Sequence, residues 1–136
     1  MIPYKTKSKK IPGTSYGEVM RNTFLVFDEK IKKKTKRRPY IRSAYFKKEK
    51  IFFDYFREHL FQKNPHDRAR RMKFFASALE LIEKSRHDPI IKTNPNKKGE
   101  IFYKFIGMTK DGHIFFVQIK ENRNKQKYFM SCFGPK

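Results

Sequence analysis

The segment 65–71, PHDRARR, places one histidine beside three arginines at the expected start of a helix. Backbone amides at a helix N-terminus bind phosphate, and a phosphate would also neutralise arginines that the helix dipole otherwise repels. His66 can exchange a proton near neutral pH, as cleavage of RNA by its own 2′-hydroxyl requires. We therefore expect a phosphate site built from Arg68, Arg70 and Arg71, with His66 as acid or base. The alternative is a solvated basic helix start.

Two other histidines, His87 and His113, lie outside the expected helices and could serve in the same proton transfer. A solvated loop position is the simpler interpretation of each, and His113, beside a hairpin turn, is the weakest candidate. The four scattered histidines and the single Cys132 lack the spacing of zinc ligands. We expect neither a metal site nor a cofactor.

The densest positive charge of the chain is the run KIKKKTKRR, residues 30–38. Lysine and arginine side chains in such a run neutralise nucleic-acid phosphates and release their condensed counterions. We expect nucleic-acid contacts from Lys32, Lys33, Lys34, Arg37 and Arg38.

One tripeptide suggests a different chemistry. Gln118-Ile119-Lys120, at the end of an expected strand, resembles half of the site of metal-dependent restriction-type nucleases. The acidic Pro-Asp half of that site is absent, because Asp88-Pro89 has the reverse order. A metal-dependent nuclease is therefore a third and less favoured interpretation.

Apolar residues at helical spacing predict three helices in the first two thirds of the chain. They cover roughly residues 17–34, 47–63 and 66–86, with an extended segment or loop over 39–46. Residues 1–15 are rich in Lys, Pro, Gly, Ser and Thr, and we expect a flexible basic arm there.

Aromatic and β-branched runs predict three strands at the C-terminal end, over residues 101–108, 113–120 and 127–133. Helices followed by strands are typical of the α+β class. We expect one α+β domain over residues 16–136, with N-terminal helices packed on a C-terminal antiparallel β-meander of at least three strands.

Asp111-Gly112 signals a two-residue hairpin turn, which pairs Lys110 with His113 and fixes the register. The face expected to pack on the helices then carries Phe102, Lys104, Ile106, Met108, Phe115, Val117 and Ile119. The opposite face carries Ile101, Tyr103, Phe105, Phe116, Gln118 and Lys120, and Ser131 is expected beside Phe129 and Phe133. Aromatic rings beside polar and cationic groups hold single-stranded nucleic acid, so Tyr103 and Gln118 are expected to bind it. The alternative is that both faces are buried.

The overall charge supports a polyanionic partner. Lys and Arg total 34 against 13 Asp and Glu, a formal net charge of +21. Nucleic acid, RNA before DNA, is the expected partner, in preference to an anionic membrane, because no apolar run approaches the length of a membrane span. The single cysteine cannot form an internal disulfide and fits a reducing compartment, so a cytoplasmic location is expected.

The C-terminal half, from DRARRMKFF (67–75) to YFMSCF (128–133), resembles the superfamily of barnase, EndoU, colicin-type tRNases and RelE-type toxins. The shared order is a helical front, a proline before the first strand, a meander with a basic second strand, VQIKENR (117–123), and a last strand with serine beside an aromatic. The resemblance implies a metal-independent endoribonuclease. It further implies that Lys120 and Arg123 stabilise charge, that Ser131 contacts the scissile phosphate, and that His66 or His87 transfers the proton. The acid–base pair that barnase carries on its sheet has no clear counterpart.

The leading hypothesis is thus a small metal-independent endoribonuclease of the toxin or mobile-element type, for which a small acidic protein would be an apt inhibitor. The alternative is a non-catalytic accessory protein that binds RNA or DNA.

Overall fold

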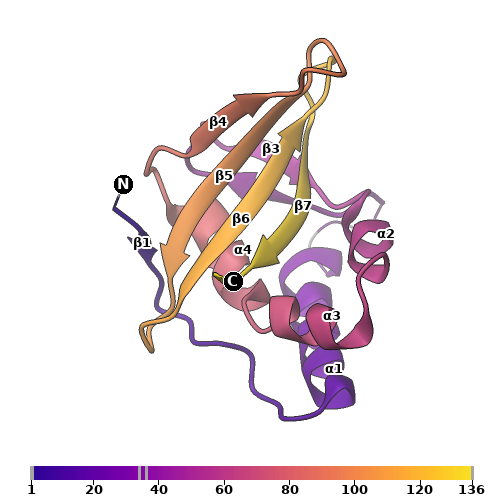
Figure 1. The fold of residues 1–136 in the computed structure, drawn as a ribbon, viewed down its shortest axis with the longest axis vertical. Helices are drawn as coiled ribbons and strands as arrows, with labels where there is room; N and C mark the ends of the chain where they lie inside the picture. The colour runs from indigo at the N-terminus through magenta and orange to yellow at the C-terminus, as the bar shows by residue number, and fades with distance from the viewer. Residues whose placement is uncertain (1, 34, 36, 136) are drawn as a thin grey trace.

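The computed structural model describes residues 2–33, 35 and 37–135 and shows a mixed α/β fold (Figure 1). Seven strands form one curled sheet in the order β1-β5-β6-β7-β3-β2, and β4 pairs with β5 beside β1. The strands are β1 (Tyr4–Lys5), β2 (Tyr40–Ser43), β3 (Glu49–Phe52), β4 (Ile90–Thr93), β5 (Ile101–Met108), β6 (Ile114–Glu121) and β7 (Lys127–Phe133). The helices are α1 (Tyr16–Phe27), continued by a π-helical turn (Asp28–Lys32), α2 (Phe56–Phe61), α3 (Pro65–Met72) and α4 (Phe75–Lys84).

The expected fold class, N-terminal helices on a C-terminal antiparallel meander, is wrong. The meander β5-β6-β7 exists, but four more strands from the first two thirds of the chain extend it at both edges. Two of the pairings, β1 with β5 and β3 with β7, are parallel, so the sheet is mixed.

The expected helix 47–63 is in fact a strand, β3, followed by the short helix α2. Lys47 and Lys48 adopt positive φ angles of 55° and 68°, which turn the chain into a hairpin with β2. Ile51 is then fully buried between the two neighbouring strands, and Phe53 reaches the core two residues later. Burial of Ile51 and Phe53, two residues apart, has the period of a strand. The apolar residues of 47–63 also fit a helical stripe, which is why the sequence predicts a helix.

The expected helix 66–86 is two helices that meet at Phe74. Asn64 caps α3 by accepting a hydrogen bond from the amide of Asp67 at 2.9 Å, and Pro65 occupies the first turn. Phe74 leaves the helical conformation and stacks on Phe115 of the sheet at 5.6 Å. The break lets α3 lie against β7 while α4 packs against β2 and β5.

Residues 2–15, the expected flexible arm, lie along the rest of the molecule. β1 pairs with β5, and Ile11 is buried with its amide donating to the carbonyl of Lys73 at 2.7 Å. The amide and hydroxyl of Ser8 both donate to the Glu80 carboxylate of α4, at 3.0 and 2.6 Å. These polar contacts hold a segment that has few apolar residues.

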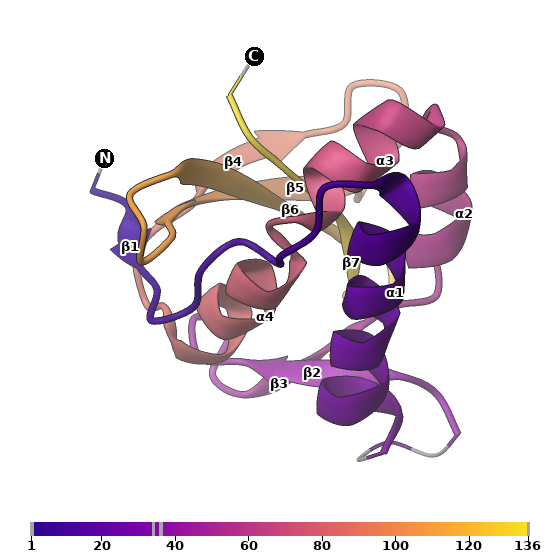
Figure 2. The same ribbon diagram turned by 90° about the horizontal axis from the view of Figure 1, so that it is seen from below.

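The core lies between α4 and the inner face of the curled sheet, which wraps around this helix (Figure 2). It combines aliphatic side chains with stacked aromatic rings from different elements, among them Phe27, Phe53, Phe56, Phe75 and Phe129. Within the described part of the chain, no helix has the length and apolar character needed to cross a membrane.

The β5–β6 register differs by one residue from the expected one. The loop has three residues instead of two: the Gly112 amide donates to the Thr109 carbonyl, and the Thr109 amide donates to the His113 carbonyl, both at 2.9 Å. Gly112 takes φ +87°, as the last position of such a loop requires. Met108 therefore pairs with Ile114, and every side chain of one strand changes face relative to the other.

A bulge in β7 also re-aims side chains. Gln118 pairs with Ser131 while Ile119 pairs with Phe129, so Met130 is an extra residue on β7. Ser131 thereby shares a face with Phe133 as expected, but Phe129 turns into the core.

Candidate nucleic-acid interface

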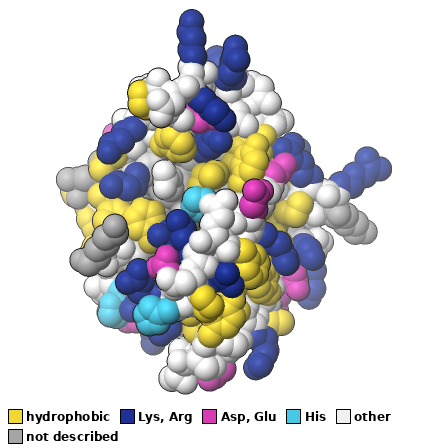
Figure 3. All heavy atoms as spheres, turned by 45° about the vertical axis from the view of Figure 1, so that its right-hand side comes forward, with side chains coloured by type: hydrophobic (Ala, Val, Ile, Leu, Met, Phe, Trp, Pro, Cys, Tyr) yellow, Lys and Arg dark blue, Asp and Glu magenta, His cyan; other side chains and the backbone are white. Residues whose placement is uncertain are grey.

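The outer face of β5, β6 and β7 is lined by aromatic, aliphatic and cationic side chains. We call this the open face; it carries Phe102, Lys104, Ile106, Met108, Ile114, Phe116, Gln118, Lys120, Tyr128, Ser131 and Phe133. Most of these side chains are half-buried, and no described helix lies over β5 and β6 on this side (Figure 1). On the side of the molecule that Figure 3 shows, apolar side chains alternate with Lys and Arg.

Cations stand over aromatic rings at the centre of the open face. Lys104 Nζ lies 5.2 Å from the centre of the Phe116 ring, and Phe116 packs against Phe133 at 5.5 Å. The Arg71 guanidinium, which projects from α3, lies 5.3 Å from the Phe133 ring. Partly exposed rings bordered by cations can stack a base and hold its phosphate.

Arg71 is held in place by two partners. Its Nη1 donates to Ser131 Oγ at 2.7 Å and its Nε donates to Asp67 at 3.0 Å. Burial of Asp67 opposes ionisation, but hydrogen bonds from Arg70 and Arg71 hold the pKa of this carboxyl below its ordinary value. Arg71 thus stays fixed at the edge of the open face beside a serine hydroxyl.

A pocket of about 790 Å³ opens where the β4–β5 and β6–β7 loops meet. We call it the Lys120 pocket; it is lined by Tyr55, Lys97, Lys98, Glu100, Lys120, Asn122, Arg123 and Asn124. Four cations surround it against one carboxylate.

Lys120 connects this pocket with the open face. Its Nζ lies 3.3 Å from Glu100 and 5.3 Å from the centre of the Tyr55 ring, which packs on Tyr128. A hydrogen bond from Asn94, joined by Lys120, lowers the pKa of the buried Glu100 carboxyl, so this group remains an anion that orients the lysine. The arrangement places a positioned ammonium beside an aromatic ring.

His66 lies at the opposite end of the sheet, in a pocket of about 780 Å³. His113 of the β5–β6 loop lines the same pocket, together with Lys10, Arg70 and Lys73. We call it the histidine pocket. A shallow pocket formed by Arg70, Arg71, Phe116, Phe133, Gly134 and Pro135 joins it to the open face, since both share three of these residues.

The four residues expected at a catalytic centre do not line one cavity. Lys120 and Arg123 share the Lys120 pocket, Ser131 contacts Arg71, and His66 lies in the histidine pocket. His87 lies away from all three, with Nδ1 3.0 Å from the carbonyl of Ile2.

The expected binding residues are also dispersed. The expectation that Tyr103 shares a face with Gln118 is wrong: Tyr103 is buried on the inner face, where burial and a hydrogen bond to Glu121 raise its pKa to about 12. Arg68 donates to the carbonyls of Lys63 and Phe61 and thus ties two helices together.

Of the described residues of the basic run, Arg38 contacts the open face through Tyr128. Lys32, Lys33 and Arg37 are exposed, and Lys34 lies outside the described residues. Arg38 stacks on Phe52 at 3.7 Å, and its Nη2 donates to the Tyr128 hydroxyl at 3.3 Å.

Sequence reasoning missed Tyr55, Lys97 and Lys98. The pair Lys97-Lys98 in the turn PNKKG was the one available signal, because charged loop residues next to a strand end often contact ligands. In the described ranges, His, Cys, Asp and Glu side chains do not come together in groups of three or more. Comparisons with protein-family models, with curated proteins and with solved structures found no match for this chain.

Proposed function

We propose that this protein binds single-stranded nucleic acid, RNA in preference to DNA, along the open face. The observation that carries the proposal is the alternation of partly exposed rings with cations between the histidine pocket and the Lys120 pocket. From Ile114 to Lys120 the strand β6 advances six residues, roughly 20 Å at about 3.3 Å per residue. A few stacked nucleotides match this length.

The chemistry favours a single strand over a duplex. Phe102, Phe116 and Phe133 present ring surface that paired and stacked bases cannot use, whereas each stacked base contributes about 1–3 kcal/mol. Lys104, Arg71 and Lys120 lie beside the rings, where the phosphates of such a strand would pass. We place this activity in the cytoplasm, where the buried thiol of Cys132 stays reduced.

Binding of a fluorescent oligo(U) to the variant Phe116→Ala tests the proposal. We expect the affinity to fall about tenfold, because a stacking surface is lost while the charge is kept. Phe61→Ala is the matched control, since Phe61 is 46% exposed on α2 and lies outside the open face. Equal affinities of the two variants would contradict the proposal.

A ribonuclease is the second candidate, and the histidine pocket is the observation that favours it. His66 and His113 line one pocket with Lys10, Arg70 and Lys73. Two imidazoles can act as general base and general acid while cations stabilise the charge on the phosphorane, without a metal. This chemistry agrees with the activity that the resemblance to the barnase and RelE-type superfamily implies.

Incubation of the protein with total RNA in EDTA, with and without ribosomes, tests this second candidate. Cleavage that is lost in both His66→Gln and His113→Gln, while oligo(U) binding is kept, would support it. RNA that stays intact under all these conditions would contradict the ribonuclease candidate and leave nucleic-acid binding as the only proposed function.

A further inference from the structure

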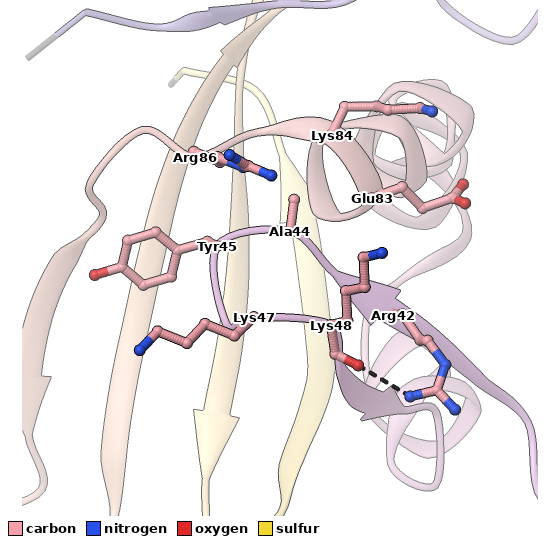
Figure 4. Close-up of a pocket in the computed structure, with 8 residues that line it drawn as sticks. All are labelled: Arg42, Ala44, Tyr45, Lys47, Lys48, Glu83, Lys84 and Arg86. Carbon is pink, nitrogen blue, oxygen red and sulfur yellow. Dashed lines mark hydrogen bonds between the residues drawn. The ribbon is translucent and has the colours of Figure 1, made fainter.

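Another cavity lies on the side of the molecule opposite the open face. Its volume is about 1040 Å³, and it lies between the β2–β3 loop and the C-terminal end of α4 (Figure 4). We call it the hairpin pocket; it is lined by Arg42, Ala44, Tyr45, Lys47, Lys48, Glu83, Lys84 and Arg86. Figure 2 shows α4 between the sheet layer of β5 and β6 and the hairpin β2–β3.

The hairpin pocket has a large excess of positive charge. Five of its eight lining residues are cationic and one, Glu83, is anionic. Among the described residues none of these five cations forms an ion pair, whereas Arg38, Arg71, Lys120 and Lys127 do. The end of α4 contributes the equivalent of about half a negative charge, which offsets only a small part of the excess.

The backbone holds two of these lysines in an unusual conformation. Lys47 and Lys48 have φ angles of 55° and 68°, a region that residues other than glycine rarely occupy. Hydrogen bonds fix the loop: the Lys48 amide donates to the Ser43 carbonyl at 2.7 Å, and Arg42 Nη1 donates to the Lys48 carbonyl at 3.0 Å. Backbone strain of this kind is common at functional sites. Here the strained loop keeps Lys47 and Lys48 close to Arg42.

The pocket floor is rigid. The Ala44 amide donates to the Ile82 carbonyl of α4 at 3.1 Å, and Tyr45 packs edge-on against Phe105 at 5.5 Å. The cations therefore project from a hairpin that is held against α4 and from the C-terminal end of α4.

We propose that the hairpin pocket binds phosphates of the RNA backbone, at a second site separate from the open face. Its cations lie on the other side of the sheet from Phe116 and Phe133, so a short single strand on the open face does not reach them. A folded RNA, whose segments are held at fixed separations, can place one segment on each side. The proposal extends the proposed function and can fail independently of it.

The test compares two RNA probes. One is an unstructured oligo(U) of about six nucleotides, a length within the site size of a single-strand platform; the other is folded, mixed tRNA. Lys47→Gly/Lys48→Gly removes two cations at positions where glycine adopts the backbone readily, and Lys84→Gln/Arg86→Gln removes two without affecting the hairpin. Arg21→Gln/Lys30→Gln, on the exposed surface of α1 and its π-helical turn, is the control of equal charge.

We expect both pocket variants to bind tRNA at least tenfold more weakly than the control variant, with oligo(U) affinity within about twofold of the parent. The slope of log affinity against log salt should flatten by about 0.7–0.9 for each phosphate that the variant no longer neutralises. Equal tRNA affinity in pocket and control variants overturns the proposal, as does a parallel loss of oligo(U) binding. Unchanged tRNA binding with lost binding to phosphatidylserine vesicles would overturn it in favour of a lipid headgroup.

Discussion

Arg71 is the residue through which the helical layer contributes to the open face. It reaches from α3 across the edge of the sheet to Ser131 and the Phe133 ring, and Asp67 holds its other side. A guanidinium can keep several such contacts because its donors lie in one plane, while an ammonium is a single point charge. Its orientation, as well as its charge, should therefore matter for binding.

Arg71→Lys tests this reasoning. The substitution keeps the charge but cannot maintain both hydrogen bonds and the ring contact, so we expect oligo(U) affinity to fall about tenfold, or about 1.4 kcal/mol. Arg70→Lys is the control, because Arg70 is 61% exposed and forms its ion pair at the surface. Fluorescence anisotropy measures the affinities, and urea titration verifies that both variants remain folded. Similar losses in both variants would show that the contacts of Arg71 with Ser131 and the Phe133 ring have no special role in binding.

Asp67 gives a prediction for acid conditions. Its pKa in the folded protein is lowered, so its contribution to stability is complete above the unfolded pKa, about 3.9, and is lost as the pH falls through the lower folded value. The urea midpoint should therefore decrease between about pH 5 and pH 2, and Asp67→Asn should flatten this part of the profile. A variant profile parallel to that of the parent would show that the ion pairs with Arg70 and Arg71 do not stabilise the fold.

At the scale of elements, the sequence predicts the strands better than their register. The limits expected for the last three strands, 101–108, 113–120 and 127–133, lie within a residue of β5, β6 and β7. Asp111-Gly112 correctly marks a turn, but the hydroxyl of Thr109 accepts from the His113 amide at 3.0 Å and supports a three-residue loop. The additional loop residue shifts the register of β5 and places Tyr103 in the core. The local sequence does not distinguish a two-residue from a three-residue loop here.

Other elements depend on partners that are distant in sequence. The sequence of β3 fits a helix, but the segment pairs as a strand with β7, more than 70 residues away. Likewise, β1 forms a strand by pairing with the edge of β5. The sites follow the same rule. Composition predicted a nucleic-acid partner, but Tyr55 and Lys97 meet Lys120 only when three loops converge.

The two hairpins of the meander share one loop geometry, and this leads to a prediction about Lys125. The Lys125 amide donates to the Asn122 carbonyl at 2.8 Å and the Asn122 amide to the Gln126 carbonyl at 2.9 Å, as in the β5–β6 loop. Lys125, with φ 66°, occupies the position that Gly112 occupies there. Lys125→Gly should relieve this conformation and raise the free energy of unfolding by about 0.5–1 kcal/mol.

Urea denaturation measures this change, and Gly112→Ala is the reciprocal variant. Alanine at φ +87° meets the strain that Lys125 already bears, so a decrease of about 1 kcal/mol in the free energy of unfolding is expected. Opposite signs for the two variants would confirm the common geometry. A neutral or destabilising Lys125→Gly would show that contacts of the lysine side chain outweigh the strain.

At the scale of the whole molecule, the chain has a net charge of +21, and part of its cationic surplus lies on two opposite sides of one sheet. The open face combines cations with rings, while the hairpin pocket has five cations and a single ring, Tyr45. The first arrangement suits bases and phosphates together, and the second suits phosphates alone. Different RNAs should therefore use different parts of the surface.

Salt dependence should separate these two modes in the unmodified protein. A short strand that meets about four cations of the open face should give a slope of about −3 in log affinity against log salt, at about 0.7 per phosphate. Folded tRNA also reaches the hairpin pocket, so its slope should be steeper by at least about 2. Anisotropy titrations from low to moderate salt measure both slopes. Identical slopes would mean that both RNAs occupy the same cations, and a flat response to salt would contradict phosphate binding on either side of the sheet.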